Sequence, residues 1–85
     1  MTNSNVEIWG ASASPTEAGY VLAGGWNWFY PAIGKVKGTA GNLERWVTGY
    51  KHEWESIYDS HEKETTWEWF GTSSKDSAFD WYDNQ

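Results

Sequence analysis

Two Trp-x-Trp triplets contain the side chains of this chain that are best suited to recognise a ligand. They are Trp26-Asn27-Trp28 and Trp67-Glu68-Trp69. Successive side chains of a strand point to opposite faces, so the two rings of each triplet share a face and the polar residue points away. Flat indoles pack against the apolar faces of sugars, while a nearby amide or carboxylate orients the hydroxyl groups. The triplets predict a carbohydrate site in which Asn27 and Glu68 reach a ligand bound at an edge or across a subunit boundary.

The sequence patterns of known enzyme sites are incomplete here. Residues 10–14 lack the closing Gly of a nucleophile elbow. Residues 60–63 match Ser-x-x-Lys, but the enzyme context of that motif is missing. Glu53 and Glu55 share one face of a strand, whereas the carboxylates of a glycosidase face each other across a cleft. We therefore expect a protein that is not an enzyme.

Metal ligands and cofactor motifs are also missing from the sequence. The two imidazoles, His52 and His61, form no His-x-x-x-His pair, and there is no cysteine. The acidic residues do not follow the spacing of a calcium-binding loop, and no glycine-rich phosphate loop is present. We expect neither a metal nor a cofactor.

The charge of the chain is negative and unevenly distributed. The net charge is −6, and residues 53–85 hold nine acidic side chains but only two lysines. An acidic chain without a basic patch is poorly suited to binding nucleic acid or anionic lipid. The polar, uncharged N-terminal residues do not resemble a Sec signal peptide, and no apolar stretch is long enough to form a transmembrane helix. These features predict a protein that is cytoplasmic or is released without a cleaved signal.

Alternating apolar and polar residues predict short strands separated by Gly, Pro and small-residue turns. Pro31 is expected to end a strand, because it lacks a backbone donor and restricts the residue before it. Residues 14–17 fit either the start of a short helix or a Pro turn that leads into a strand. The other expected elements are a strand at 6–9, a turn at 24–25, a strand at 26–30, an edge strand at 33–38, a loop at 39–42 and a weak last strand at 77–82.

The segment 43–58 sets aromatic residues at regular intervals among charged ones. As a strand, it places four rings on one face. These are Trp46, Tyr50, Trp54 and Tyr58. A helical stripe is the alternative, but Gly49 and the many aromatic and β-branched residues favour the strand.

The polar break at 59–65 predicts a hairpin between this strand and the one that contains Trp67. A two-residue loop would place Trp54 opposite Trp67, which is favourable. The same register would place Glu53 opposite Glu68, which is unfavourable, so a longer loop is the alternative.

The chain has more aromatic surface than so small a protein can enclose. Folding buries roughly 9,000 Å² for a chain of this mass. The eight Trp, five Tyr and three Phe, at roughly 200 Å² each, would take up about a third of that area. Several indoles are therefore expected at the surface, in a groove or against a second subunit. In the alternative to a sugar site, one ring of each triplet belongs to the core and the other to a subunit interface.

Together these features predict one all-β domain over residues 1–85. It is a small antiparallel sheet, sandwich or barrel of five to seven short strands, with room for one short helix, and it self-associates as a homo-oligomer. The first functional hypothesis is a non-enzymatic, lectin-like module that binds carbohydrate. One alternative is a membrane-active, toxin-like oligomer whose Trp and Tyr settle at the lipid interface. Another is an assembly subunit that binds a protein partner.

Overall fold

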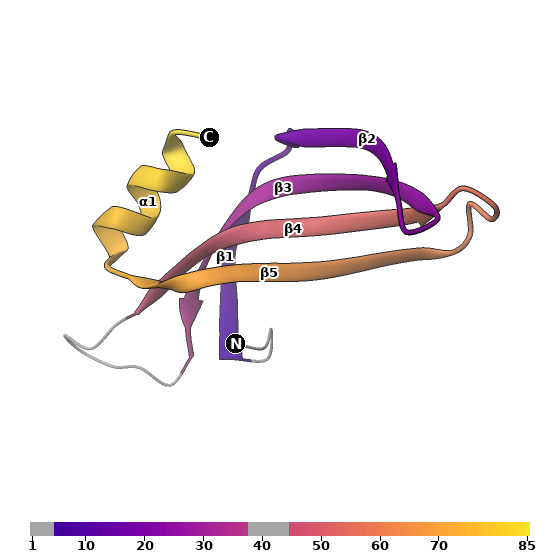
Figure 1. The fold of residues 1–85 in the computed structure, drawn as a ribbon. Coiled ribbons are helices and arrows are strands. Elements are labelled where there is room, and N and C mark those ends of the chain that lie inside the picture. The colour runs from indigo at the N-terminus through magenta and orange to yellow at the C-terminus, as the bar shows by residue number, and fades with distance from the viewer. Residues whose placement is uncertain (1–4, 38–44) are drawn as a thin grey trace.

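Two long paired strands, at residues 25–36 and 46–56, form the centre of the structure. The computed structural model describes residues 5–37 and 45–85. Its elements are β1 (Val6–Ala11), β2 (Glu17–Leu22), β3 (Gly25–Val36), β4 (Trp46–Ser56), β5 (Lys63–Ser73) and α1 (Lys75–Asp83). All strand pairs are antiparallel: β4 lies between β3 and β5, while β1 and β2 pair with successive parts of the other edge of β3 (Figure 1). The predicted small all-β fold is confirmed, as a sheet with one short helix.

The central strand β3 continues through Pro31, so the predicted strand end at this residue and the separate edge strand at 33–38 are wrong. The carbonyl of Pro31 accepts a hydrogen bond from the Ser12 backbone N–H at 2.8 Å. In an antiparallel strand, the N and O of one residue point to the same side. The missing donor of Pro31 therefore faces the break between β1 and β2, where the ladder is already interrupted and little is lost.

A two-residue turn joins β2 to β3 one residue earlier than expected. Ala23 and Gly24 both have positive φ, of 55° and 74°, as in the type I′ turn that matches the twist of a hairpin. Gly25 is instead the first residue of β3, where a Cβ would overlap the indole of Trp54. Of the two alternatives for residues 14–17, the structure has the turn that leads into a strand.

Most of the aromatic segment 43–58 forms a strand, β4, and the helical alternative is wrong. The expected loop at 39–42 and residues 43–44 lie outside the described residues. Tyr58 follows the end of β4 and is exposed.

The β4–β5 hairpin has a longer connection than the two-residue loop, and the register based on that loop is wrong. Trp54 lies opposite Glu64, and Glu53 lies opposite Thr65. This register avoids a Glu–Glu contact and places Glu55 beside Lys63.

The expected last strand at 77–82 is wrong, because these residues belong to α1. The Ser74 side chain accepts a hydrogen bond from the Ser77 backbone N–H and so caps the helix. One side of α1 packs on one end of the sheet and forms a small core. The residues in contact are Ile33, Trp46, Ala78, Phe79 and Tyr82.

The molecule is long and thin, with extents of 48 × 26 × 17 Å. Among the described elements, only α1 covers a face of the sheet, and only at one end (Figure 1). Of the eight tryptophans, all of them described, Trp46 alone is fully buried. The predicted surplus of aromatic surface is therefore confirmed. Within the described residues, no helix combines the length and apolar character needed to cross a bilayer.

Candidate functional site

Alternate residues of β3, β4 and β5 form the sheet face opposite α1. The helix packs on Ile33 and Trp46, whose side chains point to the other face of the sheet. The strand register aligns the residues of the opposite face in four rows that cross the three strands. The rows are Trp26–Glu55–Lys63, Trp28–Glu53–Thr65, Tyr30–Lys51–Trp67 and Ala32–Gly49–Trp69. We call this surface the ring face: its aromatic rings stand on β3 and β5, and β4 contributes a charged side chain to each of the first three rows.

The charged side chains of the ring face are arranged as ion pairs. Lys51 Nζ lies 3.3 Å from Glu53 Oε1, and Lys63 Nζ lies 3.4 Å from Glu55 Oε1. The Lys51 ammonium also lies 4.7 Å from the centre of the Tyr30 ring, where the negative ring face attracts it. All four charged groups are partly exposed. The ring face therefore presents carboxylate acceptors and ammonium donors to solvent beside its rings.

The two rings of β5 support each other. Trp67 and Trp69 are nearly parallel, with centroids 5.7 Å apart and an interplanar angle of 9°. Trp69 also reaches across the sheet: its Cη2 atom lies 3.4 Å from the position that a Cβ of Gly34 would take. The Nε1 atom of Trp69 is enclosed and has no hydrogen-bond partner among the described residues. Trp69 therefore serves as packing behind Trp67 more than as a contact surface.

A hollow of about 420 Å³ is lined mainly by residues of the first three rows of the ring face, together with Trp54 and Glu64, which have the other parity. Ring edges and charged side chains both line it. The lining residues are Trp28, Tyr30, Glu53, Trp54, Glu55, Lys63, Glu64 and Thr65. Next to it, Trp26 is 39% exposed. The hollow thus brings an aromatic wall from β3 together with polar groups from β4 and β5.

The structure places all four indoles of the two Trp-x-Trp triplets on the ring face, although β4 separates β3 from β5. Asn27 and Glu68 lie on the other face, as alternation predicts.

Asn27 is 1% exposed, and its contacts are internal. The Asn27 Nδ2 atom donates to the carbonyls of Tyr20, Leu22 and Gly25, at 3.4, 3.0 and 3.0 Å. Its Oδ1 atom lies 2.6 Å from His52 Nε2. These contacts occupy both ends of the amide. Asn27 therefore holds the β2–β3 hairpin together and has no group left for a ligand.

Glu68 is exposed and lines a different hollow, together with Tyr20 and Phe29. It lies beside no ring of the ring face, because β5 turns it to the opposite side.

Sequence reasoning missed the polar partners of the four indoles. Lys51, Glu53 and Glu55 share the parity of the ring face, but only the strand registers show which indole each one lies beside. Glu55 and Glu53 are paired with Trp26 and Trp28, and Lys51 is paired with Trp67. Glu53 and Glu55 were expected to share a face. They do share a face, and each has a lysine partner. Tyr30 has the parity of Trp28 and could have been included from the sequence.

Within residues 5–37 and 45–85, no three His, Cys, Asp or Glu side chains are grouped so as to hold a metal ion. Comparison of the chain with models of protein families, with curated proteins and with solved structures finds no match. A functional assignment therefore depends on the geometry of the chain itself.

Proposed function

We propose that the ring face binds an extended carbohydrate chain. The observation that supports this most strongly is that, in three successive rows on one sheet face, an aromatic ring of β3 lies beside a charged side chain of β4. A sugar presents an apolar C–H face and hydroxyl edges, so its site needs flat rings beside hydrogen-bonding groups. The first three rows of the ring face each combine the two.

Each side chain has a distinct role in this proposal. Trp26, Trp28 and Trp67 stack on sugar rings, and Trp69 holds Trp67 in place. The carboxylates of Glu53 and Glu55 accept hydrogen bonds from hydroxyl groups. Because both ion pairs are partly exposed, a hydroxyl can take the place of a water molecule at either carboxylate.

The shape of the site favours a chain over a single sugar. Same-face residues on a strand are about 6.8 Å apart, so the three rows that combine rings with polar groups extend over about 14 Å. No bond cleavage is proposed, because Glu53 and Glu55 project side by side from one strand and do not oppose each other across a scissile bond.

Binding is tested by titrating the protein with a broad panel of soluble oligosaccharides while tryptophan fluorescence is recorded. We expect a saturable change for at least one oligosaccharide. The variant Trp28→Ala should weaken this binding about tenfold, since loss of one stacking ring costs about 1.4 kcal/mol. The matched control is Trp9→Phe, because Trp9 packs against Trp46 on the other face. No fluorescence change with any sugar would contradict the proposal.

The membrane-active alternative predicts a different result. It predicts release of dye from zwitterionic liposomes, whereas a carbohydrate site leaves the liposomes intact. The two experiments together therefore separate these functions.

A second proposal is that the chain self-associates through β5, which has a partner strand on one side only. The Ser56 backbone N–H donates to the carbonyl of Glu62, so alternation turns the backbone groups of residues 63, 65, 67 and 69 away from β4. An edge of this length, with a single Lys, is an open template for another strand.

A further inference from the structure

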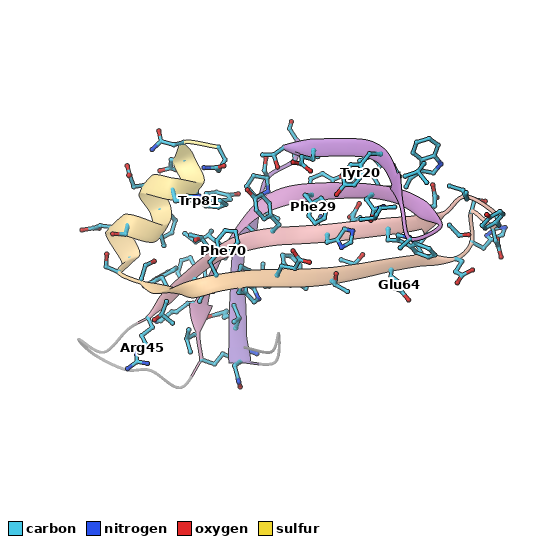
Figure 2. The ribbon with its side chains drawn as sticks, viewed as in Figure 1. Tyr20, Phe29, Arg45, Glu64, Phe70 and Trp81 are labelled. Carbon is cyan, nitrogen blue, oxygen red and sulfur yellow. The ribbon has the colours of Figure 1, made fainter. Side chains whose placement is uncertain are left out.

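A second aromatic hollow lies on the face that carries α1, between β2 and β5. Its volume is about 270 Å³. Four rings, two of them tyrosines, line it together with two carboxylates and one threonine. The lining residues are Thr16, Glu17, Tyr20, Phe29, Tyr50, Glu68 and Phe70. We call it the acidic hollow. Figure 2 shows Tyr20, Phe29, Phe70 and Trp81 along this side of the molecule, between β2 and α1.

The acidic hollow combines one nearly parallel pair of rings with a third ring set perpendicular to its neighbours. Tyr20 and Phe29 are nearly parallel, at 13°, whereas Tyr50 is turned 86° from Phe29 and 82° from Phe70. Centroid distances between these neighbours are 5.7 to 6.2 Å. Perpendicular rings form the walls of a cage rather than a flat stack.

Neighbouring side chains fix these walls in position. Phe29 stacks on His52 with centroids 4.3 Å apart. His52 is in turn held by the side chain of Asn27. On the other side, Trp81 of α1 packs edge-on against Tyr50 and Phe70. The cage is therefore formed before any ligand binds.

The charge of the acidic hollow is negative. Glu17 comes from β2 and Glu68 from β5, so the two carboxylates belong to strands on opposite sides of the rings. Lys51 lies over the Tyr30 ring and Lys75 over the Trp46 ring, and neither of those rings lines the acidic hollow. The described residues that line the hollow include no Lys, Arg or His.

We propose that the acidic hollow binds a methylated ammonium cation. Ring faces attract cations, and cages of aromatic rings recognise quaternary ammonium groups in particular. Such a group is weakly hydrated, so it loses little on entering an aromatic site, and Glu17 and Glu68 supply the opposite charge. The bearer of the group is either a small molecule or a lipid headgroup. This site is independent of the ring face, because it lies on the opposite side of the sheet and shares no lining residue with it.

The first test is a titration of the folded protein with choline chloride, followed by amide NMR signals. We expect saturable shifts at Tyr20 and Glu68. The neutral isostere 3,3-dimethylbutan-1-ol should bind about tenfold more weakly, since it has the shape of choline without its charge. Equal binding of the two compounds would overturn the proposal, because the hollow would then be an apolar pocket only.

The variants Tyr20→Ala and Glu68→Gln should each weaken choline binding at least about threefold. Both side chains are exposed enough for the fold to tolerate the change. Glu62→Gln is the charge-matched control, since Glu62 lies in the hairpin connection and does not line the acidic hollow. Unchanged affinity in both variants would overturn the proposal.

Co-sedimentation with phosphatidylcholine vesicles distinguishes the two sources of the cation. Binding of free choline without vesicle binding indicates a small molecule, and vesicle binding that Tyr20→Ala abolishes indicates a headgroup. Absence of both kinds of binding overturns the proposal. The variant Trp28→Ala should leave choline binding unchanged, so that failure here is separable from failure of the carbohydrate site.

Discussion

The side chain of Asn27 connects three backbone carbonyls of the β2–β3 hairpin with the ring of His52. The Nδ2 atom of Asn27 donates to the carbonyls, so its Oδ1 atom can only accept. His52 Nε2 therefore carries a proton and donates it to Asn27 Oδ1. This buried network sets the position of β2 on β3. It also fixes the Phe29–His52 stack that supports the acidic hollow. The side chain of Asn27 thus positions both β2 and the Phe29–His52 stack, on which the acidic hollow depends.

Replacing Asn27 by Ala is expected to destabilise the protein by about 2 kcal/mol or more, since it leaves buried partners unsatisfied. Urea denaturation measures the loss. Asn84→Ala is the control, because Asn84 is exposed and bonds only within the last turn of α1, so a change of about 0.5 kcal/mol is expected. Equal stability of Asn27→Ala and the parent chain would contradict the network.

Gly49 marks a close approach of β4 and β5. A Cβ there would overlap the backbone carbonyl of Glu68 and come within 2.9 Å of Trp69 Cα. Backbone atoms of a paired strand cannot move aside cheaply, so Gly49→Ala should cost about 3 kcal/mol. Gly71→Ala in the same hairpin meets nothing within 4 Å and should be nearly neutral. Similar melting temperatures for the two variants would show that this close approach is absent in solution.

At the scale of elements, periodicity located the strands, but their ends and partners depended on distant residues. Alternation predicted Trp26 and Trp28 on one face, and β4 as a strand. The prediction that Pro31 ends a strand was wrong because β3 accommodates the proline only where it faces the break between β1 and β2. The residues next to Pro31 in the sequence do not indicate that break. The residues of α1 alternate weakly, and only the Ser74 cap signals a helix.

The ring face also could be predicted only in part from the local sequence. Parity alone places each Trp pair on a face. Which β4 residues lie beside Trp67 and Trp69 depends on the β4–β5 register, which a loop of uncertain length leaves open.

The β2–β3 turn offers a gain in stability. Ala23 has a φ of 55°, a left-handed conformation that costs an L-residue with a Cβ about 1 kcal/mol. Asn tolerates this conformation, and Asn-Gly is the preferred type I′ pair. Ala23→Asn is therefore expected to raise the free energy of unfolding by up to about 1 kcal/mol, measured by urea denaturation. A loss of stability would contradict the type I′ assignment.

At the scale of the whole molecule, the sheet is larger than the helix that covers it. The radius of gyration is 14.3 Å, against about 12 Å for a compact domain of this length. An extended sheet has long edges and wide faces relative to its core. The ring face, the acidic hollow and the open edge of β5 all result from this shape.

Pairing of β5 with a second copy predicts oligomers whose fraction rises with concentration in sedimentation velocity. Thr65→Pro should abolish them, because the N–H of residue 65 points outward and its loss leaves the β4 ladder intact. Thr66→Pro is the contrast, since the N–H of residue 66 points toward β4 and its loss should destabilise the fold. A parent chain that is monomeric at every concentration would contradict this pairing.

The most direct test of the ring face is the affinity for a series of oligosaccharides of increasing length, taken from whichever sugar gives a response. The proposal predicts that affinity rises with each added sugar until the chain spans the first three rows, about 14 Å, and then levels off. The variant Trp28→Ala should flatten that rise. An affinity that is independent of chain length, or a rise that Trp28→Ala leaves unchanged, would contradict the proposal.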